Sequence, residues 1–433
     1  MKNSIAFFIL LRIANFSYGQ DTFSISGSVT SVEQGTPLAF ATIGIGGSPY
    51  GTVSNADGEF LVIIPYEHEN DTLSVSYVGF KTAKIRIKEA LQRSTLNVEL
   101  TERIIALKQV EVNAEKLTAK QIIDRAIVKV EENFPQDPFI MRGFFRDIRT
   151  QNSKTVYLVE AALDVWDHGI SLSKDLPKKF FLRSVRASET RVHNLLWGSL
   201  LNSGNSLSVN LAHNFWLNRL KFSADKSEYQ IEDLTSIDDK YLYVISTEQI
   251  VSMSDLAEQY KDMKFRMIHK YHIDAETFAI HKVQHLEEPL EGPYIGKERP
   301  YEGDTLFYSK KGWNQTTEFE EFNGKMYLKY HDVTYAFDIV DEKNNAIFLD
   351  MAYQFSFIAT DIREGKEIKP EGEKMNRMKP LTLQAGVYDE SFWNDESNAK
   401  LVPLTKRQIT ELEEEQPLSV QFRSKKKKLK RSR

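Results

Sequence analysis

The sequence predicts a mainly β protein. We expect an N-terminal antiparallel β-sandwich, a linking α-helix, and a larger curved antiparallel β-sheet, half-barrel-like, with a helical insertion. Short segments that alternate apolar and polar residues recur along the chain, and this alternation is typical of half-buried strands. The 433 residues are enough for two or three domains. A hydrophobic content of 41%, with 21 glycines in addition, is that of a globular protein with sizeable cores.

The first domain is expected over residues 20–100. Short strands are predicted at 23–29, 38–45, 58–65, 72–78, 81–87 and 95–100. Strands of this length at this spacing favour an antiparallel sandwich. Asn55-Ala56-Asp57-Gly58 predicts a turn between two of them, because asparagine and aspartate side chains bond their own backbone and glycine accepts a positive φ.

Four motifs of this domain occur in an order that is familiar. They are Ser26-Gly27-Ser28-Val29, Pro37-Leu38-Ala39-Phe40-Ala41-Thr42-Ile43, Gly51-Thr52-Val53-Ser54-Asn55-Ala56-Asp57-Gly58-Glu59-Phe60 and Ser76-Tyr77-Val78-Gly79-Phe80. Together they resemble the carboxypeptidase regulatory-like domain, a transthyretin-like β-sandwich. The resemblance covers about the first quarter of the chain. It implies a module without peptidase chemistry, of the kind that precedes the plug of many TonB-dependent receptors in Gram-negative envelopes and also heads smaller secreted proteins.

Residues 101–133 are expected to link the two domains. Leu107 to Ala114 alternates as a strand and is similar to the segment that starts the plug in those receptors, so Leu107, Val110 and Val112 are candidate partner-binding residues. Thr118 and Gln121 then form the capping box of a helix. Its apolar residues fall on one face and predict packing against the following sheet.

A β-rich domain is expected over residues 134–390, followed by an extension at 391–422 and a basic tail at 423–433. The segment from Leu195 to Leu220 is expected to be a mixed insertion with a short helix, and Gly292 to Gly303 a loop. A tight hairpin around Ala275-Glu276, between highly charged strands, suggests an open curved sheet. That shape is similar to the half-barrel of periplasmic lipoprotein carriers. An apolar ligand is then expected against one of its faces.

The N-terminus, residues 1–19, has the pattern of a secretory signal peptide. Lys2 precedes a short apolar run, and small residues stand before a cleavage site between Gly19 and Gln20. A buried N-terminal helix is the alternative. The chain contains no cysteine, which excludes disulfides, thiolate zinc sites and thiol nucleophiles. We therefore expect an exported protein, periplasmic or associated with the outer membrane.

Four histidines crowd the predicted hairpin. A two-residue loop at Ala275-Glu276 would place Lys270 opposite His281, and His272 and His281 would be diagonal neighbours on one face, about 7–8 Å apart. A metal would need a further ligand there. The spacing of His285 and Glu288 is the His-x-x-Glu pair of zinc carboxypeptidases. His272, His281, His285 and Glu288 are therefore candidate metal ligands, whereas exposed, solvated histidines are the simpler interpretation.

The last eleven residues carry eight positive charges, among them Lys425, Lys426, Lys427 and Lys428. Such a tail could contact anionic polysaccharide or lipid head groups, at about 1 kcal/mol per basic residue near an anionic surface, or remain solvated. The formal net charge of −5 and the predicted export argue against a nucleic-acid partner.

No nucleophile elbow, phosphate loop or cofactor motif is found in the sequence. The leading hypothesis is thus a non-enzymatic envelope protein, without a cofactor or catalytic residues, that binds a partner protein such as an outer-membrane receptor, a polysaccharide or an apolar ligand. Two alternatives remain: a metal-dependent envelope hydrolase, and an outer-membrane transport component associated with a TonB-dependent receptor.

Overall fold

The computed structural model describes residues 22–46, 48, 50–103, 117–174, 176–188, 207, 211, 213–214, 216–217, 220–221, 228–237, 240–252, 264–291, 299–301, 304–341, 343–344, 346–365, 367–384, 388–394 and 402–423. Some of the predicted features lie outside these residues. They are the cleavage site at Gly19 and Gln20, the strand with Leu107, Val110 and Val112, and the tail with Lys425, Lys426, Lys427 and Lys428.

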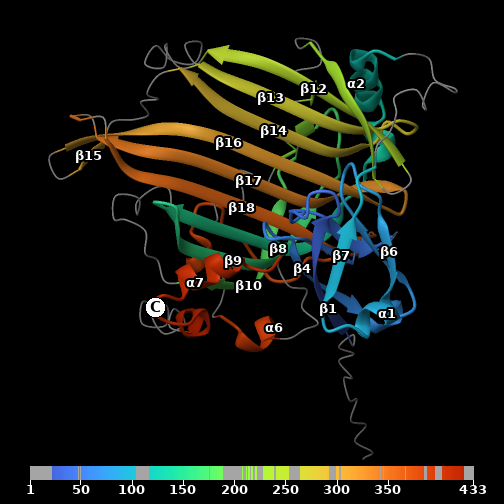
Figure 1. The fold of residues 1–433 in the computed structure, drawn as a ribbon, viewed down its shortest axis with the longest axis horizontal. Helices are drawn as coiled ribbons and strands as arrows, with labels where there is room; N and C mark the ends of the chain where they lie inside the picture. The colour runs from blue at the N-terminus through green and yellow to red at the C-terminus, as the bar shows by residue number, and fades with distance from the viewer. Residues whose placement is uncertain are drawn as a thin grey trace, which may run out of the picture.

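The first domain is a β-sandwich, as predicted (Figure 1). One sheet has the strand order β4-β1-β7 and the other β3-β2-β5-β6. The inward residues of both sheets, such as Val29, Ile43 and Ile64, are fully buried in one core. The strands are β1 (Thr22–Ser31), β2 (Thr42–Ile45), β3 (Gly51–Val53), β4 (Glu59–Pro65), β5 (Thr72–Ser76), β6 (Ala83–Arg86) and β7 (Leu96–Leu100), with a 3-10 turn η1 (Tyr66–His68) and a short helix α1 (Ile87–Leu91).

The predicted turn before β4 forms as its residues require. The Asn55 side-chain oxygen accepts hydrogen bonds from the backbone N–H groups of Asp57, at 2.9 Å, and Glu59, at 2.8 Å. Gly58 has a φ of 76°.

One strand pair departs from the antiparallel pattern, because β1 and β7 are parallel. Parallel neighbours need a long connection. Here strands β2 to β6, which lie between β1 and β7 in the sequence, form that connection.

The linking helix begins where the capping box predicts. Helix α2 (Ala119–Val128) has Thr118 as its N-cap, and the side chains of Thr118 and Gln121 bond each other's backbone N–H groups. Ile122, Ile123 and Ala126 are buried, which confirms the predicted apolar face. A second short helix, α3 (Val130–Asn133), follows directly and ends before Phe134.

The rest of the described chain is dominated by one large open sheet with the order β11-β12-β13-β14-β16-β17-β18-β8-β9-β10-β19, in which β15 pairs with β16. All its strand pairs are antiparallel. β11 and β19 form its edges. The strands are β8 (Phe139–Gln151), β9 (Lys154–Asp167), β10 (Lys179–Ala187), β11 (Gln230–Ile237), β12 (Lys240–Ser252), β13 (Lys264–Asp274), β14 (Ile280–Glu291), β15 (Arg299–Tyr301), β16 (Asp304–Phe322), β17 (Lys325–Asp341), β18 (Ile347–Glu364) and β19 (Glu373–Lys374).

Two predictions for this sheet are wrong in detail. The segment from Gly292 to Gly303, expected to be a loop, contains β15. The β13–β14 hairpin has a longer turn than Ala275-Glu276, because Asp274 accepts hydrogen bonds from the N–H groups of Glu276 and Thr277 and Phe278 takes a φ of 56°. The observed register pairs His272 with Lys282 and His269 with His285.

Both faces of the sheet are covered. Met141 and Phe145 on β8 belong to a core that includes Leu207 and Leu211 of the insertion. The alternate residues Phe144 and Ile148 belong to a separate core on the other face. That second core is completed by the sandwich and by C-terminal residues of α6 (Glu390–Asn394), α7 (Lys406–Leu412) and a last helical stretch at 418–423. The 3-10 turn η6 (Leu381–Leu383) contributes Leu381 to the first core.

The described residues of the insertion fill part of the space against the sheet. Trp216, Leu217 and Leu220 of the insertion are buried with helix α2 and strands β12 to β14 in one core. Among the described residues, a cavity of about 30 Å³ remains between this insertion and the sheet, lined by Lys178 and His331 among others. A space of this size holds a water molecule rather than a lipid. Within the described parts of the chain, none of the helices has the length and apolar character of a membrane span.

Candidate functional site between the two domains

The sandwich is fixed against the large sheet by direct contacts. Val53 of β3 is fully buried in the core that contains Phe144 and Tyr330. The ring of Phe40 stacks on Tyr330, with 5.4 Å between ring centroids and 29° between the planes. The Asn55 side-chain amide donates to the carbonyl oxygen of Pro403 in the extension at 3.3 Å. The two domains therefore hold a defined relative position.

A charged pair of the sheet reaches into the sandwich. Lys329 on β17 is 4% exposed, and its ammonium lies 2.8 Å from the Glu320 carboxylate on β16. The pair faces the β2–β3 hairpin, where a Cβ atom on Gly51 would come within 2.7 Å of the Lys329 ammonium. Glycine at this position lets the hairpin approach the buried charge.

Beside this contact the two domains enclose a cleft of about 530 Å³. The sandwich contributes Thr42, Gly46, Ser76 and Val78. The sheet contributes residues of β12, β14, β16 and β17. This volume lies within the range of about 300–1,000 Å³ that is typical of ligand sites, and a boundary between domains is a common place for them.

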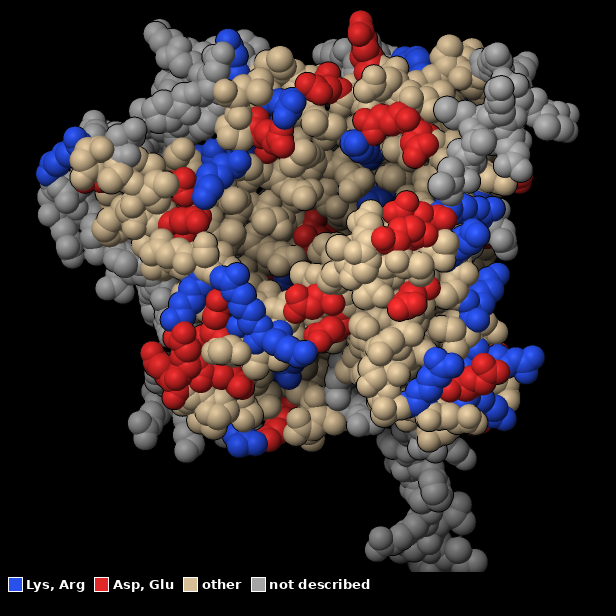
Figure 2. All heavy atoms as spheres, in the orientation of Figure 1, with Lys and Arg blue, Asp and Glu red and all other residues tan. Residues whose placement is uncertain are grey.

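Three lysine–glutamate pairs line the cleft from the sheet side. Each joins a lysine to a glutamate of β16 or its end: Lys282 with Glu318 at 2.7 Å, Lys329 with Glu320 at 2.8 Å, and Lys240 with Glu321. The cleft is thus rich in charge and formally balanced. Figure 2 shows basic and acidic side chains together over the visible face of the molecule, on the sheet and on the sandwich. The arrangement suits a polar ligand or a peptide segment better than a strongly anionic polymer.

His281 is the predicted site residue that lies in this cleft. It is 9% exposed, and burial, with the nearby charge of Lys240 as a second cause, lowers its pKa from 6.5 to about 4. Its Nε2 atom lies 3.9 Å from the Asp274 carboxylate, beyond hydrogen-bond distance. His281 is therefore neutral at pH 7, so it can donate or accept a hydrogen bond but carries no charge there.

The structure separates the other predicted metal ligands. His285 is 2% exposed and lies against the His269 ring, at 4.6 Å between ring centroids. Glu288 lies three residues further along the same strand, so the two side chains point to opposite faces. Glu288 instead pairs with Arg266 across the β13–β14 ladder. The His-x-x-Glu pair therefore does not chelate one ion.

The expectation that the histidines are solvated is also wrong. His272 is 7% exposed, its Nε2 atom lies 3.3 Å from the Gln284 side-chain oxygen, and burial lowers its pKa to about 3. The strand is covered on both faces, which the sequence of a charged strand does not reveal. Among the described residues, no group of three or more histidine, aspartate or glutamate side chains is arranged to hold a metal ion.

The cleft itself was not predicted from the sequence. Glu318 and Glu320 lie on β16 and Lys329 on the adjacent strand β17. They line the cleft opposite Thr42 and Ser76, which are far from them in the sequence. The one available signal was Gly51, because a glycine in a strand marks a close approach of another group.

Comparison with known proteins assigns the sandwich. Residues 25–112 match the family model of the CarboxypepD_reg-like domain. The first domain is a CarboxypepD_reg-like domain. The match runs beyond the sandwich strands to residue 112, and so includes Leu107, Val110 and Val112.

The chain is also related to a receptor. The chain is similar to TonB-dependent receptor P3 of Formosa agariphila, with 34% identity over 84 residues. The match covers 19% of this chain and 8% of the receptor. The chain thus shares a small part of the receptor's length, and this relation fits an envelope-associated β-sandwich protein.

Proposed function

We propose that the protein is a non-enzymatic binding or accessory protein of the cell envelope, exported to the periplasm or the outer membrane, which binds a partner in the cleft between the two domains. The observation that carries this proposal is the cleft of about 530 Å³, which only the docked pair of domains creates. The CarboxypepD_reg-like domain and the receptor relative support the envelope location.

The chemistry of the cleft supports recognition over reaction. General acid–base catalysis needs a group whose pKa lies near the working pH. Here His281 titrates near pH 4, and the lysines are paired with glutamates. Paired charges of this kind provide orientation and specificity for a complementary partner.

A tryptophan at the cleft tests the binding site. Glu321 is exposed and is the residue before the last one of strand β16, so Glu321→Trp fills the cleft without disturbing a core. Glu248→Trp, at an exposed position of β12, is the matched control. We expect the wild-type protein and the control to retain one envelope component from a solubilised envelope fraction at equal yield, and Glu321→Trp to lose it. Equal retention by all three proteins would exclude the cleft as the binding site.

Location is tested separately. We expect the protein in the periplasmic or outer-membrane fraction, with Gln20 as its N-terminal residue. Recovery from the cytoplasm with residues 1–19 still attached would remove the basis for an envelope function.

A second candidate function is a transport component associated with a TonB-dependent receptor, and the receptor relative favours it. It predicts that such a receptor copurifies with the protein and is lost when residues 107–114 are deleted. Copurification that survives the deletion would contradict the role of this segment.

A further inference from the structure

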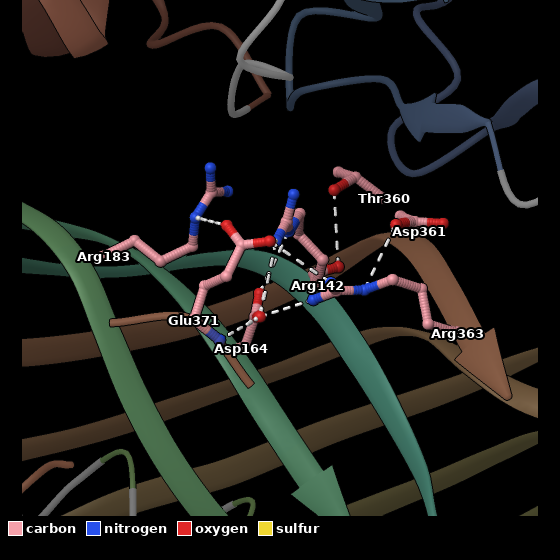
Figure 3. A network of polar contacts seen from close by, with 7 residues as sticks. All are labelled: Arg142, Asp164, Arg183, Thr360, Asp361, Arg363 and Glu371. Carbon is pink, nitrogen blue, oxygen red and sulfur yellow. Dashed lines mark hydrogen bonds and ion pairs between the residues drawn. The ribbon is translucent and has the colours of Figure 1, made fainter. Parts of the chain in front are cut away.

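Three arginines from different strands converge on one exposed carboxylate (Figure 3). Arg142 on β8, Arg183 on β10 and Arg363 on β18 approach Glu371, at 2.6, 3.6 and 3.3 Å between nitrogen and oxygen. The arginine side chains are 17–27% exposed, whereas Glu371 is 54% exposed. The carboxylate thus lies on top of a partly buried guanidinium cluster and faces solvent.

A buried carboxylate fixes the cluster from below. Asp164 on β9 is fully buried and accepts hydrogen bonds from Arg142, at 3.0 Å, and from Arg363. It also accepts one from the backbone N–H of Glu371, at 2.8 Å. Asp164 therefore holds the guanidinium groups of Arg142 and Arg363 and the Glu371 backbone independently of the Glu371 side chain. The third guanidinium group, that of Arg183, lies over the Phe392 ring.

The charge balance favours an anion at this point. The cluster has three arginines and three acids, Asp164, Asp361 and Glu371, so without the Glu371 carboxylate it carries a formal charge of +1. Burial, followed by the charge of Arg142, lowers the pKa of Arg183. Burial alone would raise the pKa of Glu371, but its hydrogen bond to Arg142 and the arginine charges outweigh this and lower it.

The carboxylate arrives on an extended stretch of chain. Directly after Glu371, strand β19 pairs with β10, with Lys374 opposite Phe181 and Glu373 opposite Leu182. Gly372 allows the close approach, since a Cβ atom there would lie 2.3 Å from the Leu182 carbonyl oxygen. The structure therefore shows these arginines binding a glutamate of an extended peptide, the geometry by which arginine clusters recognise acidic motifs.

We propose that Arg142, Arg183 and Arg363 form a binding site for a glutamate or aspartate side chain of a protein partner, and that the Glu371 side chain occupies this site in the free protein. A partner's carboxylate would displace the Glu371 side chain and bridge the same guanidinium groups. The site is distinct from the interdomain cleft, and the inference does not depend on the function proposed for that cleft.

The test compares a labelled hexaglutamate peptide with a hexaglutamine peptide on the full chain. We expect Glu371→Gln to bind hexaglutamate at least tenfold more tightly than the wild type, with binding that weakens as salt is added. Glu373→Gln, two residues away and also exposed, is the matched control and should behave as the wild type. The double variant Glu371→Gln with Arg183→Gln should bind hexaglutamate no more tightly than the wild type.

Glu371→Asp supplies a second variant, whose shorter side chain should give an intermediate affinity. Thermal unfolding of every variant establishes that the fold is kept. An unchanged affinity in Glu371→Gln, or an equal gain in Glu373→Gln, would overturn the site. Tighter binding of an oligouronate than of hexaglutamate would overturn the choice of a protein partner.

Discussion

Glu160 and Asp164 on β9 are both fully buried, and each lies between two arginines. Glu160 pairs with Arg146 on β8, at 2.6 Å, and with Arg186 on β10, at 2.5 Å. Burial alone would raise the pKa of Glu160, but the charges of Arg186 and Arg146 lower it. Removing one member of such a group leaves an unpaired buried charge, so these residues fix the arrangement of the three strands more than they add to its stability.

The buried histidines predict how stability depends on pH. His272 and His281 have folded-state pKa values of about 3 and about 4, below the ordinary 6.5. The unfolded chain therefore binds more protons as the pH falls below 6.5, and the free energy of unfolding falls with it. We expect this loss to approach about 1.4 kcal/mol per pH unit for each histidine as the pH falls towards 5.

Urea unfolding at several pH values measures this slope. In the variant His281→Asn the slope should be reduced by about one proton. A slope that is the same in His281→Asn and in the wild type would contradict the assignment of a depressed pKa to this residue.

At the scale of elements, local chemistry decides where helices begin. Two helices start with complete capping boxes, α2 at Thr118 and α7 at Thr405, and both boxes could be read directly from the sequence pattern. The β13–β14 hairpin shows the limit of this reading. Two turn residues were expected, but the side chain of Asp274 bonds two backbone N–H groups and lengthens the turn, which shifts the register of every histidine pair.

The capping box of α2 gives a stability prediction. Thr118→Ala removes the side-chain oxygen that accepts the Gln121 N–H at 3.3 Å, so we expect a loss of about 1 kcal/mol in the free energy of unfolding. Thr118→Ser retains the hydroxyl and should lose only a few tenths of this. Chemical denaturation measures both. Equal losses in the two variants would show that the cap does not determine the effect.

At the scale of the whole molecule, the sandwich and the sheet are one assembly because their contact buries Val53 and stacks Phe40 on Tyr330. The cleft exists only while this contact holds. The separate core around Val29 and Ile43 nevertheless gives the sandwich an apolar interior of its own. The unfolding of the sandwich is therefore coupled to the unfolding of the sheet mainly through the contacts of Val53 and Phe40.

Phe40→Ala tests this coupling. Loss of the stacked ring should lower the free energy of unfolding by about 2 kcal/mol and separate the unfolding of the sandwich from that of the sheet into two transitions. Tyr66→Ala removes an exposed ring that packs edge-on against Phe23 of the sandwich, so it should weaken the sandwich slightly without changing the domain contact. Calorimetry distinguishes the two variants by the number of their unfolding transitions. A single transition in Phe40→Ala, at an unchanged temperature, would contradict the docking role.

Features that depend only on neighbouring residues follow from the amino-acid sequence. The turn at Asn55 to Gly58, the capping boxes and the alternating strands of the sandwich all follow from the conformational preferences of a few adjacent side chains. The sandwich motifs were likewise sufficient to indicate the CarboxypepD_reg-like domain.

Which residues form sites depends on contacts between distant parts of the chain. Glu371 meets Arg142 and Arg183 from more than 180 positions away, and Lys329 meets the hairpin at Gly51 from a greater distance still. His285 and Glu288 look like a ligand pair by spacing, yet the two-residue period of a strand sends them to opposite faces. Charged residues separated this far in the chain are brought together by strand order and domain docking, which local preferences do not encode.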